Sequence, residues 1–133
     1  MTESIIPNGK TYDVIIVGGS YAGLSAAMAL GRSIKRVLII DSGQPCNRQT
    51  PYSHNFITQD GEKPAAISEK AKAQVLKYDT VKFLSGIAAA GKKTESGFTV
   101  STKGGGEFSA EKLIFASGIK DMMPDIKGFS ECW

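Results

Sequence analysis

The stretch YDVIIVGGSYAGLSAA, residues 12–27, decides the fold of this chain. Residues 12–17 form a β-branched run without polar alternation, which is typical of a strand buried on both faces of a parallel sheet. A glycine-rich turn follows, and residues 24–33, rich in alanine and leucine, predict a helix. Residues 36–41 predict a second buried strand. A strand, turn, helix and strand within about 30 residues indicate a right-handed βαβ unit.

The chain beyond this unit first becomes irregular. Residues 42–63 are rich in glycine, proline and asparagine and predict a long loop, a feature that is often functional in a compact domain. A helix is expected to begin near Pro64, because apolar residues recur at helical spacing after it. Residues 81–84 predict a short third parallel strand.

The segment from about residue 86 to residue 111 predicts an antiparallel meander. Its strands are expected at residues 87–93, 98–102 and 107–110, because glycine-containing turns separate them. Residues 112–116 predict a further buried strand, closed by a serine and a glycine. Together these elements predict an α/β domain, Rossmann-like, with a parallel sheet and a small antiparallel β-meander.

The composition, with 41% hydrophobic and 22% charged residues, is that of an ordinary globular domain rather than a disordered chain. A length of 133 residues suits one domain and excludes separate cofactor and substrate domains. The net charge of +3 argues against nucleic acid, and no apolar run approaches the ~18 residues that span a bilayer. Cys46 and Cys132 form no metal motif, and without an export signal they predict free thiols in a reducing cytoplasm.

The turn at residues 18–23 has the chemistry of a phosphate-binding site. Gly18 and Gly23 hold the first and third positions of the glycine fingerprint, and Ser20 replaces the middle glycine. Unpaired amides at the start of the following helix, together with the helix dipole, favour a pyrophosphate. Asp41 ends the second strand, where a carboxylate binds ribose hydroxyls and repels a 2′-phosphate. The pattern predicts a dinucleotide site that does not prefer NADP; the alternative is a glycine turn that binds no dinucleotide.

Four stretches have a recognisable order: residues 12–27, then 37–48 (VLIIDSGQPCNR), 54–61 (HNFITQDG) and 113–128 (LIFASGIKDMMPDIKG). Together they resemble the N-terminal part of thioredoxin reductases and related FAD-dependent pyridine nucleotide–disulfide oxidoreductases. The first stretch is shared by many flavin and nicotinamide proteins, whereas the four together are much more specific. The resemblance implies a Rossmann-like FAD-binding domain that is incomplete relative to the family.

The resemblance also implies roles for particular residues. The glycine turn should hold the FAD pyrophosphate, Asp41 the adenosine ribose, and Asn55 should lie near the flavin. The backbone at Gly118 should return to the cofactor, and Ile87 or Ala88 should lie against the adenine. The implied cofactor-binding residues are Gly18, Ser20, Tyr21, Ala22, Gly23, Asp41, Ser42, Gln44, Asn47, Asn55, Ile87, Ala116, Ser117 and Gly118. No catalytic residue and no metal ligand is predicted.

The polar side chains of the irregular segment have a second interpretation. Gln44, Asn47 and Arg48 suit a loop that lies along an extended cofactor, but ordinary loop polarity explains them equally well. His54, the only histidine, fits a structural or cofactor-packing role better than catalysis. Cys46 is expected to be a packed or exposed thiol rather than a nucleophile.

The implied organisation is a flexible lead-in at residues 1–11, an FAD-binding portion at residues 12–118 and a connector at residues 119–133. The connector would lead to an NAD(P)H-binding domain. Enzymes of this kind pass electrons from NAD(P)H through the flavin, usually with a CxxC pair, to thioredoxin-like proteins or small disulfides. The reverse reaction, an oxygen-dependent oxidation of a small dithiol, is the other direction that the resemblance leaves open. The chain has neither a CxxC nor a second glycine fingerprint. We therefore expect a fragment, ending at Trp133, of a protein of about 300 residues, not competent in catalysis alone.

Two alternatives stay open. The chain could be a stand-alone dinucleotide-binding module without turnover, or a fragment of an NAD-dependent dehydrogenase. The second fits the first fingerprint but not the meander followed by the Ala-Ser-Gly stretch at residues 116–118. The expected partners are a small-molecule dinucleotide and a second copy of the chain, with no nucleic acid and no membrane. Self-association would use apolar surface that the absent part of the domain normally covers.

Overall fold

The computed structural model describes residues 9–47 and 49–132. Its elements in chain order are β1 (Thr11–Val17), α1 (Tyr21–Arg32), β2 (Val37–Asp41), α2 (Pro64–Val75), β3 (Val81–Ser85), β4 (Ala88–Thr94), β5 (Gly97–Thr102), β6 (Glu107–Phe115) and α3 (Phe129–Cys132). Both predicted helices and the first five predicted strands are found, with ends shifted by up to three residues. Most of the predicted lead-in, residues 1–8, lies outside the described residues.

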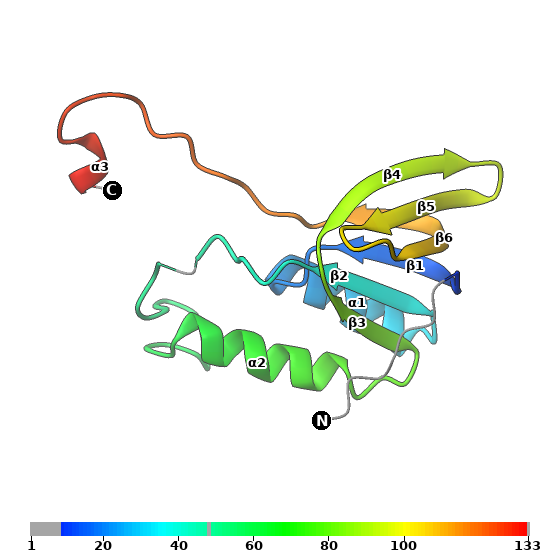
Figure 1. Ribbon diagram of the computed structural model, residues 1–133. Coiled ribbons are helices and arrows are strands. Elements are labelled where there is room, and N and C mark those ends of the chain that lie inside the picture. Colours follow the sequence, from blue (N-terminus) through cyan, green and yellow to red (C-terminus); the bar gives the residue numbers. More distant parts are fainter. Residues whose placement is uncertain (1–8, 48, 133) are drawn as a thin grey trace.

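The strands of the described chain form one mixed sheet in the order β3-β2-β1-β6-β5-β4 (Figure 1). β1 is the centre of the parallel part, because it pairs with β2 on one side and with β6 on the other. β3 extends the parallel part beyond β2. β4 and β5 form an antiparallel hairpin that pairs with β6. The predicted α/β architecture is confirmed, and the meander proves to be part of the same sheet.

Apolar side chains fill both faces of the central strands. On one face, Ile16 and Ile39 pack in a buried cluster with Leu24 of α1. On the opposite face, Ile15 of β1 packs with Phe108 of β6 in a second cluster. Successive residues of a strand point to opposite faces, so β1 must be apolar at nearly every position. Complete burial of one such side chain contributes roughly 1.5–3 kcal/mol.

β6 corrects the prediction of two separate strands at residues 107–110 and 112–116. It runs without a break, because β1 pairs with it in parallel from Ser109 to Phe115, across the boundary expected between the two strands. Only its first residues also pair with β5. The end of β6 is not buried as predicted, since Phe115 is 73% exposed.

Two chain segments also differ from the predicted boundaries. α1 begins at Tyr21, three residues earlier than predicted, so the end of the glycine turn forms the first helical turn. The segment after Gly118 leaves the sheet at the end of β6, is exposed over residues 119–127, and ends in α3, which was not predicted (Figure 1). No helix in the described part of the chain is long and apolar enough to cross a membrane.

An ion pair joins the amino-terminal ends of β1 and β2. Arg36 Nη2 lies 2.8 Å from Asp13 Oδ1, and the Arg36 amide donates to Asp13 Oδ2 at 2.7 Å. Hydrogen bonds from the side chain and the backbone of Arg36 lower the pKa of Asp13 from its ordinary value of 3.8 to about 2. Asp13 therefore ties the first strand to the residue that precedes the second.

Replacing Asp13 with Asn should lower the free energy of unfolding at neutral pH and have little effect near pH 2. A carboxyl group whose pKa is lowered by folding contributes stability above its unfolded pKa, and this contribution is lost as the pH falls from 3.8 toward about 2. Urea unfolding of both chains across this pH range measures the difference. A difference that stays constant with pH would contradict the role assigned to the Asp13 carboxylate.

Candidate cofactor-binding site

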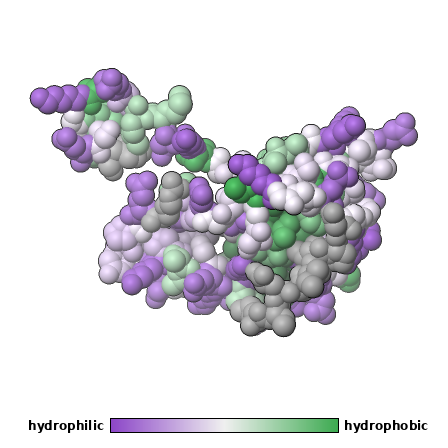
Figure 2. All heavy atoms as spheres, viewed as in Figure 1, coloured by the Kyte–Doolittle hydropathy of each residue, from purple (hydrophilic) through white to green (hydrophobic). Residues whose placement is uncertain are grey.

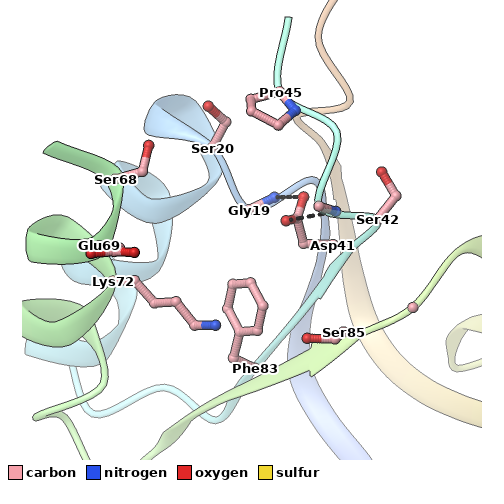
Figure 3. A pocket seen from close by; sticks show the side chains of 12 residues that line it. Gly19, Ser20, Asp41, Ser42, Pro45, Ser68, Glu69, Lys72, Phe83 and Ser85 are labelled. Atoms are coloured by element: carbon pink, nitrogen blue, oxygen red, sulfur yellow. Dashed lines mark hydrogen bonds between the residues drawn. The ribbon is translucent and has the colours of Figure 1, made fainter. Parts of the chain in front are cut away.

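The carboxyl ends of β1, β2 and β3 meet the N-terminus of α1 at a pocket of about 440 Å³ (Figure 3). Parallel α/β sheets bind ligands at this edge, and the volume is within the usual range for small-molecule sites. The wall comes from the turn after β1, the loop after β2, one side of α2 and the end of β3. The lining residues are Gly19, Ser20, Asp41, Ser42, Gly43, Pro45, Ser68, Glu69, Lys72, Phe83, Ser85 and Gly86.

Two glycines set the shape of the turn between β1 and α1. A Cβ on Gly23 would overlap the Gly18 carbonyl oxygen and would lie 3.4 Å from Cγ2 of Ile16. Gly18 has a φ of 108°, and a Cβ there would overlap the carbonyl oxygen of Ala116. Because neither position has a side chain, α1 approaches the end of β1 closely, and the turn approaches Ala116 after β6.

The start of α1 is available to an anion. Ser20 is the N-cap, yet its side chain makes no capping hydrogen bond within the described chain. The first-turn amides of a helix have no partners inside the helix, so they and the positive end of the dipole favour negative charge. No acidic residue lies in the first turn of α1. The residues present therefore fit the pyrophosphate of a dinucleotide.

Asp41 connects the glycine turn to the loop after β2. Its Oδ1 accepts a hydrogen bond from the Gly19 amide at 2.9 Å, and its Oδ2 accepts one from the Gly43 amide at 3.1 Å (Figure 3). Each carboxylate oxygen keeps a further lone pair for a ligand hydroxyl. Asp41 therefore holds the shape of the pocket, a role that the sequence did not reveal, and its predicted contact with ribose stays a prediction.

Tyr21 joins the loop after β2 to the start of α2. Its hydroxyl donates to the Pro64 carbonyl and accepts a hydrogen bond from Asn47 Nδ2, each at 3.3 Å. Neither Tyr21 nor Asn47 lines the pocket, although both were predicted to bind cofactor. These bonds give both residues a structural function beside the site.

The end of β6 returns the chain to the glycine turn, and the predicted contact of residues 116–118 with a cofactor stays a prediction. The Ala116 amide donates to the Val17 carbonyl at 2.7 Å, and the Ala116 carbonyl lies against Gly18. Ser117 and Gly118 follow in exposed positions and do not line the pocket. The structure thus brings this segment to Gly18 without closing the pocket over it.

Several predicted residues lie away from the pocket. Gln44 is exposed, Ile87 is 42% exposed, and Asn55 donates its amide hydrogen to Asp60 Oδ1 at 2.8 Å in the loop before α2. His54 Nδ1 lies 3.6 Å from the same carboxylate, with both side chains strongly exposed. Ala22 is in the first turn of α1 and does not line the pocket, and Arg48 lies outside the described residues.

The described residues contain no group of histidine, cysteine, aspartate and glutamate side chains that could hold a metal ion. Cys46 and Cys132 are both free and exposed, as predicted for thiols outside the site.

The sequence did not reveal the wall that α2 and β3 contribute. Ser68, Glu69 and Lys72 come from α2, while Phe83 and Ser85 come from β3. The four-residue spacing of Ser68 and Lys72, which places both on one side of a helix, was an available signal. No sequence signal marked Phe83 as a pocket residue, because an aromatic residue in a strand is more often part of a core.

Residues 12–133 match the profile of the family described as "Pyridine nucleotide-disulphide oxidoreductase". The chain belongs to this family. The resemblance predicted from the four sequence stretches is thereby confirmed, and with it the membership of a family of oxidoreductases.

Relatives of this family member are named as thioredoxin reductases. It is 38% identical over 124 residues to "Thioredoxin reductase tcpT" of Claviceps purpurea, a match that covers 91% of this chain and 39% of the relative. It is 33% identical over 125 residues to "Thioredoxin reductase sirT" of Leptosphaeria maculans, covering 92% and 38%.

Solved structures of the family share the fold. An oxidoreductase from Agrobacterium tumefaciens superposes with a TM-score of 0.86 at 42% identity, covering 92% of this chain and 41% of the other. A putative thioredoxin reductase TrxB from Bacillus anthracis gives a TM-score of 0.83 at 33% identity, covering 87% and 39%. The chain therefore spans between 38% and 41% of the length of these four proteins.

Replacing Gly23 with Val should abolish dinucleotide binding by this family member, whereas replacing Ser20 with Gly should be tolerated. The valine Cβ would overlap the Gly18 carbonyl and force α1 away from β1. Ser20 makes no capping bond that its loss would break. Calorimetric titration of each chain with FAD measures the effect.

The Ser20→Gly chain is the matched control within the same turn, and circular dichroism shows whether the Gly23→Val chain keeps its helices. A folded Gly23→Val chain that binds FAD as the unchanged protein does would contradict the role of the close approach. A loss greater than tenfold on Ser20→Gly, about 1.4 kcal/mol, would make its hydroxyl a phosphate ligand instead.

Proposed function

We propose that this chain is the FAD-binding portion of a thioredoxin reductase-like oxidoreductase, with the adenosine end of the cofactor beside Asp41. The observation that carries the proposal is the 2.9 Å hydrogen bond from the Gly19 amide to Asp41. It holds a carboxylate suited to ribose hydroxyls next to a helix N-terminus that, in the described part of the chain, has no side-chain cap. A dinucleotide needs both groups, one for its ribose and one for its pyrophosphate.

The choice of FAD over NAD rests on the family and the relatives that the chain matches, because the glycine fingerprint alone fits both cofactors. An NAD-dependent dehydrogenase shares the glycine turn and the acid, but the similarity to thioredoxin reductases favours a flavin enzyme. The family description supports the same choice. It names a pyridine nucleotide and a disulfide, and a bound flavin is the cofactor that would pass electrons between them. A second copy of the glycine fingerprint, which would hold a nicotinamide nucleotide, is not found in these 133 residues.

When bound, FAD supplies the redox chemistry that links a nicotinamide nucleotide to a disulfide. The residues of this chain bind and orient it. The start of α1 neutralises pyrophosphate charge, Asp41 fixes the ribose, and the segment at Ala116 supports the glycine turn from the β6 side. We propose a thioredoxin-like protein or a small disulfide as the substrate of the whole enzyme, and the cytoplasm as its compartment, which free exposed cysteines support.

An uncovered apolar surface supports association with a further part of the family fold or with a second copy of the chain. Phe115, Ile119, Met122 and Ile126 are between 62% and 90% exposed. Figure 2 shows apolar residues on the C-terminal segment, which stands away from the sheet. The chain exposes 9567 Å², whereas a compact protein of 14.1 kDa exposes roughly 6,700 Å². We propose that residues 119–133 act as a connector whose apolar side chains are covered in the whole protein.

Titration of the unchanged chain with FAD and with NAD tests the proposed function. We expect FAD to bind at least about tenfold more tightly than NAD, a difference of about 1.4 kcal/mol, because the site is proposed to be the FAD site of this family. Calorimetry gives both dissociation constants, and a yellow, flavin-absorbing complex after gel filtration gives an independent reading. Tighter binding of NAD would contradict the proposal and favour the dehydrogenase alternative.

A further inference from the structure

Lys72 places its charge inside the pocket rather than in open solvent. It lies on α2, is partly buried, and its side chain points across the pocket to Phe83 (Figure 3). The ammonium nitrogen lies 3.7 Å from the centroid of the Phe83 ring, within the range of a cation–π contact. A flexible lysine is therefore held over one aromatic face of the site.

The Phe83 ring brings that charge next to the glycine turn. A Cβ on Gly19 would lie 2.8 Å from Cε2 of Phe83 and also 2.8 Å from Cβ of Asp41. The ring thus has its edge against Gly19 and its face under the Lys72 ammonium. The same Phe83 ring therefore contacts the Lys72 ammonium and lies beside the hydrogen bond between Gly19 and Asp41.

The charges of the pocket leave Lys72 without an acidic partner. Among the described lining residues it is the only cation, and the acids are Asp41 and Glu69. Neither acid forms an ion pair with Lys72 in the described part of the chain, where the pairs are Arg36–Asp13 and His54–Asp60. Both oxygens of Asp41 already accept backbone hydrogen bonds. The ammonium therefore keeps its hydrogen-bond donors for an anionic group of a ligand.

We propose that Lys72 is a binding residue for the anionic diphosphate of the cofactor's adenosine end, contributed by α2 in addition to the glycine turn. The inference rests on the proposed function. Phe83 holds the ammonium in the pocket when no ligand is bound, and the flexible stem lets it turn toward phosphate oxygens. A dinucleotide thus meets positive charge from two sides, from the start of α1 and from Lys72.

The test compares ligands with and without phosphate on matched lysine variants. Lys72→Met keeps the apolar stem over Phe83 and removes the charge, Lys72→Arg keeps the charge, and Lys70→Met removes an exposed charge from the same helix. Calorimetry or NMR titration measures FAD, ADP and adenosine. We expect Lys72→Met to weaken FAD and ADP about tenfold, to leave adenosine within about twofold, and to reduce the salt dependence of ADP binding. Lys72→Arg and Lys70→Met should bind like the unchanged chain.

The outcomes separate this inference from the proposed function. If Lys72→Met weakens adenosine as much as ADP, Lys72 supports the wall rather than phosphate, and the inference is wrong. If Lys70→Met and Lys72→Met weaken ADP binding equally, the loss reflects the net charge of the chain rather than the position of Lys72. This result also overturns the inference. If the unchanged chain binds ADP and FAD while Lys72→Met binds them equally well, only this inference fails. If the unchanged chain binds neither ligand, the proposed function fails with it.

Discussion

The start of α1 packs against the end of β1, and the turn between them packs against the segment after β6, because Gly23 and Gly18 have no side chains at these two contacts. Every other part of the site depends on these contacts. They direct the start of α1 to the carboxyl edge of the sheet, where the Gly19 amide meets the carboxylate of Asp41. The loop after β2 and the wall formed by α2 then enclose the same edge. A single Cβ at Gly23 would move the helix that supplies the amides and the dipole.

The sheet makes this arrangement rigid by burying its central strands on both faces. Ile16 lies on the face of the sheet that packs against the helices, and Ile15 lies on the opposite face with Phe108. Neither β1 nor β2 can therefore shift without disturbing both apolar clusters. The pocket adds a few charged groups to this apolar platform, with Asp41 beside the glycine turn and the Lys72 ammonium over the Phe83 ring. A rigid apolar platform thus presents a small set of oriented polar groups, which is the general form of a cofactor site.

The βαβ unit and the glycine turn could be predicted because both are local patterns. A β-branched run, two glycines five residues apart and an acid after the second strand each have a direct physical meaning. The continuity of β6 could not be predicted, because it depends on pairing with β1, about a hundred residues away in the chain, on both sides of Glu111. The contribution of Lys72 and Phe83 depends on how α2 packs beside β3, which no pattern within either element encodes. Asn55 and Ile87 were assigned from resemblance alone, and neither lines the pocket that the described residues form.

We propose that the turn at residues 18–23, with Asp41, holds the diphosphate end of a dinucleotide. Amide chemical shifts of the isotope-labelled chain during an FAD titration report on this turn residue by residue. We expect the largest changes at Gly19, Gly23 and Gly43, with the β4–β5 hairpin unchanged. A second pocket lies at the turn between β4 and β5, at residues 93–98. Saturable changes centred there, or FAD binding that leaves the Gly19 and Gly23 amides unmoved, would show that the diphosphate lies elsewhere.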